Sequence, residues 1–378
     1  MLRGLFFSGL VILGAVLIPS LSTAQELHRD YQEVASAEVL EIISETERQI
    51  TGTDATANVQ VARILLTSGK RAGEEVEVEN EVVTLEPGDK IFVNLVETIH
   101  GDQYITYFDY ERRPPLLFII GLFVAILLFF TRWHGVRALL SLAVSAAAIF
   151  FLLIPALLAG YPPVLTIFSI AGVILFVVLF GTHGLNARSV TAFVGTLSSV
   201  IVTGLFTIVM MGYLRFTGFS ADASVYLNFA TDGKLDLSAL LLGSIIIGIL
   251  GVLDDVSITQ ASVVQELKAA NQSLGFSELY NRAIKVGRDH IGSLVNTLAL
   301  AYAGVALPLI LLYTKTQSDW WLSLNQEVIA VELVRIFIGS MGLILAVPAT
   351  TAVAAWYFST REVKAGEVCS HGHHHHHH

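Results

Sequence analysis

Gly248-Ile249-Leu250-Gly251-Val252-Leu253-Asp254-Asp255-Val256-Ser257-Ile258-Thr259-Gln260 decides the fold, because two adjacent acids end an apolar run that is long enough to cross a bilayer. A carboxylate at membrane depth costs roughly 2.5–3.5 kcal/mol, so Asp254 and Asp255 need a solvating environment. Helical spacing aligns Asp255 with Thr259, whereas Asp254 points about 100° away. We therefore expect Asp255 at a wet entrance and Asp254 as an internal ligand.

The composition indicates a polytopic membrane protein. Hydrophobic residues make up 54% of the chain and charged residues only 14%, and the apolar residues occur in blocks of bilayer-spanning length. The lipid bilayer is thus the first expected partner. Most of the acidic excess lies between Glu26 and Glu111, which argues against a nucleic-acid partner.

Cysteine usage and the C-terminal tail restrict the chemistry further. Cys369 is the only cysteine and lies in the tail, residues 362–378, which ends in a histidine tag. A disulfide within one chain and a cysteine-based metal site are excluded, and we predict neither a metal nor a cofactor.

Residues 1–24 have the pattern of a signal peptide. Arg3 precedes an apolar run from Leu5 to Ile18, and small residues lead to Ala24, where we expect cleavage. The alternative is an uncleaved N-terminal helix, and both readings export the residues that follow.

Residues 25–113 read as an extracytoplasmic β domain. Short runs alternate between apolar and polar residues, and Gly and Pro mark the turns between them. Five strands in about 80 residues predict a small all-β domain, an OB-like five-stranded barrel. The expected strands are Glu33–Ile43, Val59–Leu65, Glu75–Glu79, Lys90–Val96 and Gln103–Tyr110. An acidic, aromatic-poor barrel favours a cap, a sensor or a docking module for an extracytoplasmic protein partner.

Residues 114–361 read as a membrane all-α bundle of about seven transmembrane helices. The expected spans are Leu116–Thr131, Arg137–Leu158, Val164–Gly181, Ser189–Leu214, Leu237–Ser257, Ile291–Tyr313 and Val328–Tyr357. Residues 258–290 form a cytoplasmic amphipathic segment, in which the helix that follows Ser277 has an apolar face suited to lying along the inner membrane interface. Basic residues concentrate in the loops on one side, which predicts a multi-pass protein with the β domain outside and the C-terminus in the cytoplasm.

The last span carries a second charged feature above a smooth face. Steps of three and four residues align Glu332 and Arg335 with Gly339 and Gly342. The charged pair reads as an outer gate or as a structural ion pair, and the two glycines read as a groove for another helix, including the aspartate helix. Asn296 in the sixth span is the expected neutral partner of the acid pair.

The chain resembles the YibE/YibF-like family of bacterial membrane proteins. The resemblance rests on Gly251-Val252-Leu253-Asp254-Asp255-Val256-Ser257-Ile258, on the segments Glu332–Arg335 and Gly339–Gly342, and on Val347-Pro348-Ala349-Thr350. An exported β domain before the bundle fits the same order. The resemblance implies this architecture, the inner (cell) membrane of a bacterium and a transport role, without naming a solute.

Three classes of function follow. In the first, the protein is an ion or small-solute transporter or channel, in which Asp254 and Asp255 bind a cation or proton with Thr259 and Asn296 as neutral ligands. In the second, it is a non-enzymatic scaffold or regulatory subunit whose β domain docks a partner. An enzyme is the least favoured class, because adjacent acids on one helix diverge and do not form a protease-like dyad. The sequence leaves a homo-oligomer open.

Overall fold

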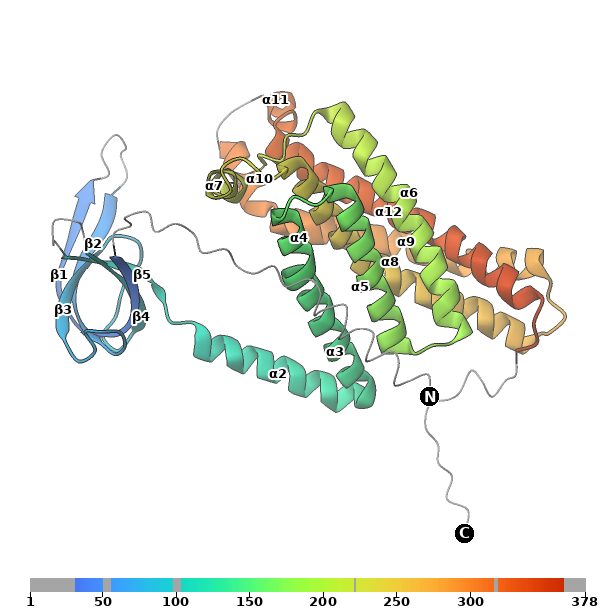
Figure 1. Ribbon diagram of the computed structural model, residues 1–378, viewed down its shortest axis with the longest axis horizontal. Helices are drawn as coiled ribbons and strands as arrows, with labels where there is room; N and C mark the ends of the chain where they lie inside the picture. Colours follow the sequence, from blue (N-terminus) through green and yellow to red (C-terminus); the bar gives the residue numbers. More distant parts are fainter. Residues whose placement is uncertain (1–30, 50–55, 98–102, 221, 316–318, 364–378) are drawn as a thin grey trace, which may run out of the picture. The chain divides into compact units, whose positions relative to one another are not determined.

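The computed structural model describes residues 31–49, 56–97, 103–220, 222–315 and 319–363 (Figure 1). The predicted signal segment, residues 1–24, and the tag with Cys369 lie outside the described residues. The chain divides into two compact units, Met1–Phe130 and Thr131–His378, and each is described by itself.

The first unit contains a closed five-stranded barrel with the order β1-β2-β3-β5-β4. All neighbouring strands pair antiparallel except β3 and β5, which are parallel. The strands are β1 (Tyr31–Gln49), β2 (Thr56–Leu66), β3 (Glu75–Asn80), β4 (Lys90–Glu97) and β5 (Gln103–Tyr110). The predicted barrel is confirmed, because alternate residues such as Val39, Ile64 and Val93 fill the interior.

Strand β1 is much longer than the sequence predicted. Its first part, from Tyr31 to Glu38, pairs with β4, and its second part, from Ala37 to Gln49, pairs with β2. Two register shifts along the second part bend the strand, so that one strand serves both sides of the barrel. Beyond Ile42 the residues are exposed on both faces, and a strand without a buried face has no hydrophobic alternation to read.

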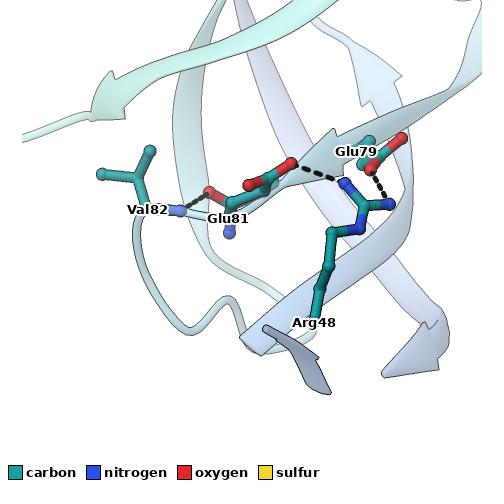
Figure 2. Close-up of polar contacts among 5 residues, drawn as sticks. Arg48, Glu79, Glu81 and Val82 are labelled. Atoms are coloured by element: carbon teal, nitrogen blue, oxygen red, sulfur yellow. Dashed lines mark hydrogen bonds and ion pairs between the residues drawn. The ribbon is translucent and has the colours of Figure 1, made fainter. Parts of the chain in front are cut away.

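Arginines of β1 and β2 form ion pairs with acids in and near the acidic strand β3. Figure 2 shows the Arg48 guanidinium of β1 between two carboxylates, with 3.0 Å from Nη2 to Glu79 Oε1 and 2.9 Å from Nη1 to Glu81 Oε1. Arg63 of β2 pairs in the same way with Glu41 and Glu77. These exposed pairs contribute little stability, so the strand is a charged, solvated surface.

Among the described residues, six helices are long and apolar enough to span a membrane. The count is seven if the bent pair α9–α10 is taken as one span. The prediction of about seven transmembrane helices is thus confirmed. Helix α2 (Arg113–Thr131) is apolar all round and has no buried residue. The remaining candidates belong to the second unit: α3 (Trp133–Ala148), which continues through a π-helical turn (Ile149–Leu153) into α4 (Ile154–Leu158), and α5 (Pro163–His183), α6 (Ala187–Leu214), α8 (Leu237–Ala270), α9 (Phe276–Val305) with α10 (Leu307–Lys315), and α12 (Glu327–Ser359).

Two short helices connect the spans, α7 (Asp222–Ala230) and α11 (Trp320–Leu324). The break between α9 and α10 turns the chain by 59°. Pro308 lies at the second position of α10, where its missing N–H does not continue the ladder of α9.

Helix α12 is the centre of the second unit and packs against α6, α8 and α9 (Figure 1). Glycines set the close approaches: a Cβ on Gly195 of α6 would lie 2.6 Å from the Cα of Thr350 on α12. The predicted groove is also occupied. A Cβ on Gly339 would lie 2.9 Å from Leu298 of α9 and 3.0 Å from Ile249 of the aspartate helix α8, and one on Gly342 would lie 3.0 Å from Thr203 of α6.

The apolar face of the helix that follows Ser277 packs against protein, whereas the sequence suited it to the inner membrane interface. Helix α8 continues without a break to Ala270, and α9 begins at Phe276 and runs directly into its span. The apolar face of the first turns of α9, with Leu279, Ala283 and Ile284, is buried in the helical core. An amphipathic pattern reports only that one face leaves water, and here protein covers that face in place of lipid.

Candidate functional site

The acid pair lies just past the middle of α8, where the helix changes from apolar to polar residues. Asp254 is half-buried and Asp255 is exposed, as the helical spacing predicted for an internal and an entrance position. The N–H of Asp255 donates to Oδ1 of Asp254 at 2.8 Å. Among the described residues neither carboxylate has an ion-pair partner within 4.0 Å.

Both acids line a cavity of about 390 Å³ that is bounded by α3, α5 and α8, which we call the acid cavity. Its walls are mostly apolar, with Ile174, Val178 and Leu250 among them. The polar residues of its lining are the two aspartates with Ser141 and Ser145 of α3 and Thr182 and His183 of α5. A few polar groups in an apolar concavity are typical of a ligand site.

Two hydroxyl groups of the acid cavity, those of Ser141 and Ser145, are anchored to backbone carbonyls. Ser145 Oγ donates to the Ser141 carbonyl at 2.8 Å, and Ser141 Oγ donates to the Val177 carbonyl at 3.5 Å. A hydroxyl that donates its hydrogen in this way still offers oxygen lone pairs. The cavity therefore presents carboxylate and hydroxyl oxygens, which are the ligands that hard cations prefer.

His183 joins the acid cavity from the last turn of α5. The imidazole lies within electrostatic range of Asp255, Arg188 and His134. Sequence reasoning did not connect this histidine with the aspartates, because they are about 70 residues apart and no periodicity links two helices. Its only signal was the His-Gly pair at the end of an apolar span.

Two of the predicted ligands do not reach the acid cavity. Thr259 and Asn296 are both exposed and neither lines it. Thr259 shares the outward stripe of Asp255, whereas the cavity lies on the flank that carries Ile247, Asp254 and Ile258. Asn296 lies on α9, a helix that contributes nothing to the lining. The predicted set Asp254, Asp255, Thr259 and Asn296 thus separates into two lining acids and two outward residues.

Glu332 and Arg335 form an ion pair on α12, 2.7 Å from Nη1 to Oε1. Nη2 of Arg335 also donates to Oγ of Ser244 on α8 at 3.2 Å. Both side chains are about three-quarters buried, and Oε2 of Glu332 is buried without a hydrogen-bond partner. The pair joins α12 to the aspartate helix on a level separate from the acid cavity.

A second polar cluster on α8 was not singled out from the sequence. Gln260 Nε2 donates to the Ala283 carbonyl at 2.9 Å and to Thr351 Oγ1 at 2.8 Å, and Thr350 Oγ1 donates to Ser257 Oγ at 3.1 Å. All four side chains are buried. We call Ser257, Gln260, Thr350 and Thr351 the buried polar layer, and its hydrogen bonds hold α8, α9 and α12 together.

Lys268 closes the end of the same helix. Its side chain is buried, and Nζ donates to the carbonyls of Gln272 at 2.7 Å, Leu274 at 2.9 Å and Ser359 at 3.3 Å. A cation at these carbonyls compensates the negative ends of α8 and α12. The sequence gives no sign of this role, because the partners of Lys268 are backbone atoms.

The part of the chain that the structure describes contains no preformed metal site. Within those residues no group of three or more His, Cys, Asp or Glu side chains is arranged to hold a metal ion. The arrangement of the acid cavity suits a single cation held by few protein ligands, or a proton.

Fold and site together define a multi-pass membrane protein whose helical unit, preceded by a small closed barrel, encloses an acid-lined cavity. The chain belongs to the YibE/F-like protein family, whose model matches residues 119–360, from within α2 to the residue after the end of α12. The match includes the acid cavity and leaves the barrel out. Comparisons with curated proteins and with solved structures found no match.

Proposed function

We propose that this protein moves a cation or a proton across the membrane through the acid cavity. The observation that carries the proposal is the pair Asp254 and Asp255, which lines a hydroxyl-bearing cavity in a spanning helix and lacks an ion-pair partner among the described residues. Ionisable groups inside membrane helices are costly and mark ion or proton paths. Unpaired carboxylates would attract a cation and repel an anion.

The residues take separate roles in this proposal. Asp254, half-buried, binds the cation, and Asp255, exposed, receives it from water. Ser141, Ser145 and Thr182 supply neutral oxygen ligands, and His183 lines the same cavity. The protein performs no covalent chemistry in this proposal and acts as a transporter, not as an enzyme.

The sidedness of the proposal follows the positive-inside pattern of the loops. In this arrangement the protein sits in the inner membrane of a bacterium, with the barrel on the extracytoplasmic side and the C-terminus in the cytoplasm. Lys268, Arg282 and Lys285 would then lie on the cytoplasmic side, together with the acid cavity.

Flux through proteoliposomes tests the proposal. The purified full chain is reconstituted, and the flux of H⁺, Na⁺, K⁺ and Mg²⁺ is followed with entrapped indicator dyes. For the ion that moves, Asp254→Asn should reduce flux by at least about ten-fold, because the neutral amide loses the attraction for a cation. Asp222→Asn, which neutralises an exposed acid of α7, is the matched control and should leave flux unchanged. Flux of every ion at the level of empty liposomes, or full flux in Asp254→Asn, would refute transport through this site.

A scaffold or regulatory role is the second candidate, and the outer surface of the barrel favours it. Val34 of β1 and Tyr104 and Phe108 of β5 are about half exposed, which is unusual for apolar side chains on so charged a domain. Such a surface suits the docking of an extracytoplasmic protein. Deletion of Gln25 to Asp109 should then remove a co-purifying partner while leaving the helical unit in the membrane.

A further inference from the structure

The register of α5 against α8 gives the acid cavity two different ends. A Cβ on Gly243, early in α8, would lie 3.2 Å from Ile167, early in α5. Further along, His183 in the last turn of α5 lies within electrostatic range of Asp255. Since early residues meet early residues and later ones meet later ones, the two helices run parallel. The lining residues of the two helices can therefore be placed at common levels.

One end of the cavity, the polar end, contains the acid pair and His183. Thr182 precedes His183 in the last turn of α5 and lines the same end. Ser141 of α3 reaches this turn, since a Cβ on Gly181 would lie 3.8 Å from the Ser141 Oγ. Neither Lys nor Arg occurs among the described residues of the lining. The polar end thus offers carboxylate and hydroxyl oxygens and has no fixed positive charge.

The opposite end, the apolar end, is lined by branched aliphatic side chains. Along α8, Leu250 and Ile247 come about one and two turns before Asp254. The parallel register brings Ile174 of α5 to the level of these two residues. The aliphatic side chains of the apolar end are Ile149, Ile174, Leu175, Ile247 and Leu250. No charged residue belongs to this end.

The cavity is larger than a single inorganic cation requires. Its volume of about 390 Å³ lies within the range of roughly 300–1,000 Å³ that is typical of pockets for small organic molecules. An inorganic cation takes oxygen ligands or keeps its own water, and oxygens are concentrated at the polar end. The apolar end has no part in binding such a cation, and water has few polar partners there.

A lipid acyl chain does not suit the cavity as a whole either. Such a chain would cover the apolar end, but it would leave the two carboxylates against hydrocarbon, where a charge is costly. An occupant that satisfies both ends carries a positive charge and an apolar body. The charge then lies at the acid pair, and the apolar body lies against the aliphatic side chains.

We propose that the acid cavity also takes a protonated aliphatic amine with one ammonium group and a body of roughly four to eight carbons, since Ile247 lies about 10 Å from Asp254 along the helix. The ammonium donates hydrogen bonds to Asp254 and Ser141, and the alkyl chain lies against Ile174, Ile247 and Leu250. This inference rests on the proposed function in taking Asp254 as the cation ligand, and it adds a class of cation that the proposed function does not name.

A series of ligands tests the proposal on the unsubstituted full chain in phosphatidylcholine nanodiscs. Isothermal titration calorimetry measures binding, and empty discs give the blank for partition into lipid. Hexylammonium should bind saturably, and butylammonium at least about ten-fold more weakly, because each buried methylene strengthens binding about four-fold. The diammonium ion of 1,6-diaminohexane should bind at least about ten-fold more weakly than hexylammonium, because its second charge enters the apolar end.

Two further ligands identify what the cavity recognises. Uncharged 1-hexanol should show no saturable binding, and phosphatidylethanolamine added to the discs should leave the affinity for hexylammonium unchanged. Saturable binding of hexanol as strong as that of hexylammonium would make the cavity an apolar crevice. Competition by phosphatidylethanolamine would assign the cavity to a lipid headgroup. Either result, or equal affinity for ammonium, the diammonium ion and hexylammonium, would overturn the proposal.

Two variants separate the ends of the cavity. Asp254→Asn should weaken hexylammonium binding by at least about ten-fold, because the amide does not neutralise the ammonium. Ile149→Thr places a hydroxyl at the apolar end and should lower the preference for hexylammonium over butylammonium to about three-fold. Ile201→Thr, the same change at a 43% exposed residue of α6 outside the lining, is the matched control and should keep the full preference. An unchanged preference in Ile149→Thr would overturn the placement of the alkyl chain.

Binding is measured without ion flux, so the two proposals fail separately. Saturable amine binding together with no flux of any ion would remove the transport proposal and leave the amine site. Flux of an inorganic ion that Asp254→Asn abolishes, together with no amine binding, would remove the amine site and leave transport.

Discussion

Within seven residues, α8 carries polar groups of two opposite kinds. Ser257 and Gln260 belong to the buried polar layer, and both side chains find their partners on α9 or α12. Asp254 and Asp255 face the acid cavity, where no cation of the described residues pairs with them. The first set stabilises the bundle, and the second is the pair that we propose binds a cation.

The largest effect is expected where a charge is compensated within the bundle. Arg335→Met leaves the Glu332 carboxylate partly buried and unpaired and should lower the free energy of unfolding by about 3 kcal/mol. Reversible unfolding in detergent micelles measures the change. The double variant Glu332→Gln/Arg335→Met should recover most of the loss, and a double variant as unstable as the single one would show that packing, not charge, is responsible.

Close packing between α6 and α12, the helix that also packs against α8, is the next test. Gly195→Val on α6 would drive a side chain into the backbone of Thr350 and should cost about 2–3 kcal/mol, because neither helix can yield without disturbing the buried polar layer. Gly212→Val on the same helix has no atom within 4 Å of its Cβ and serves as the control. Equal thermal stability of the two variants would contradict the tight α6–α12 contact.

The buried polar layer itself should respond to the loss of one member. Gln260→Ala removes hydrogen bonds to Ala283 and Thr351 and leaves a small void, so we expect a loss of about 2 kcal/mol in the free energy of unfolding. Ion flux per folded molecule should stay unchanged. A variant of native stability would mean that the layer is not what joins α8 to α9 and α12.

The smallest effect on stability is expected on the side of α8 that faces the acid cavity. Asp254→Asn removes an unpaired, half-buried charge and should leave the free energy of unfolding unchanged or raise it by up to about 1 kcal/mol. This variant combines full stability with lost flux, the reverse of Gln260→Ala. If Asp254→Asn instead unfolds the protein, the contrast between the two sides of α8 fails.

Periodicity predicted most elements because it reports burial directly. The spans from Pro163 to Leu214 and the four shorter strands lie close to their expected limits. Periodicity failed where a strand has no buried face, and where protein rather than lipid covers the apolar face of a helix. The second half of β1 is exposed on both faces, and the apolar face of α9 near Ala283 is covered by protein. At the end of the sixth span, Pro308 bends the helix, and hydropathy does not register a change of direction.

Two of the four predicted ligands, Asp254 and Asp255, line the acid cavity. Helical spacing correctly separated Asp254 from Asp255, since both lie on one helix whose geometry is known in advance. The neighbours Ser141, Ser145 and His183 come from other helices, and Asn296 lies outside the cavity, because the rotation and pairing of helices depend on side-chain packing. Gly195 and Gly287 show the same limit: their sequence neighbourhoods give no sign that Thr350 and Val347 fill the space beside them.

The sequence by itself determined that this chain crosses a membrane several times, that a small barrel precedes the helices, and that two acids occupy a spanning helix. These features follow from hydropathy, alternation and helical geometry, which are local along the chain. Only the tertiary structure decided which face of α8 is closed by α12 and which opens to the acid cavity. That choice rests on contacts between residues far apart in sequence, where a glycine, a hydroxyl or a missing counter-charge on one helix acquires its meaning from the next.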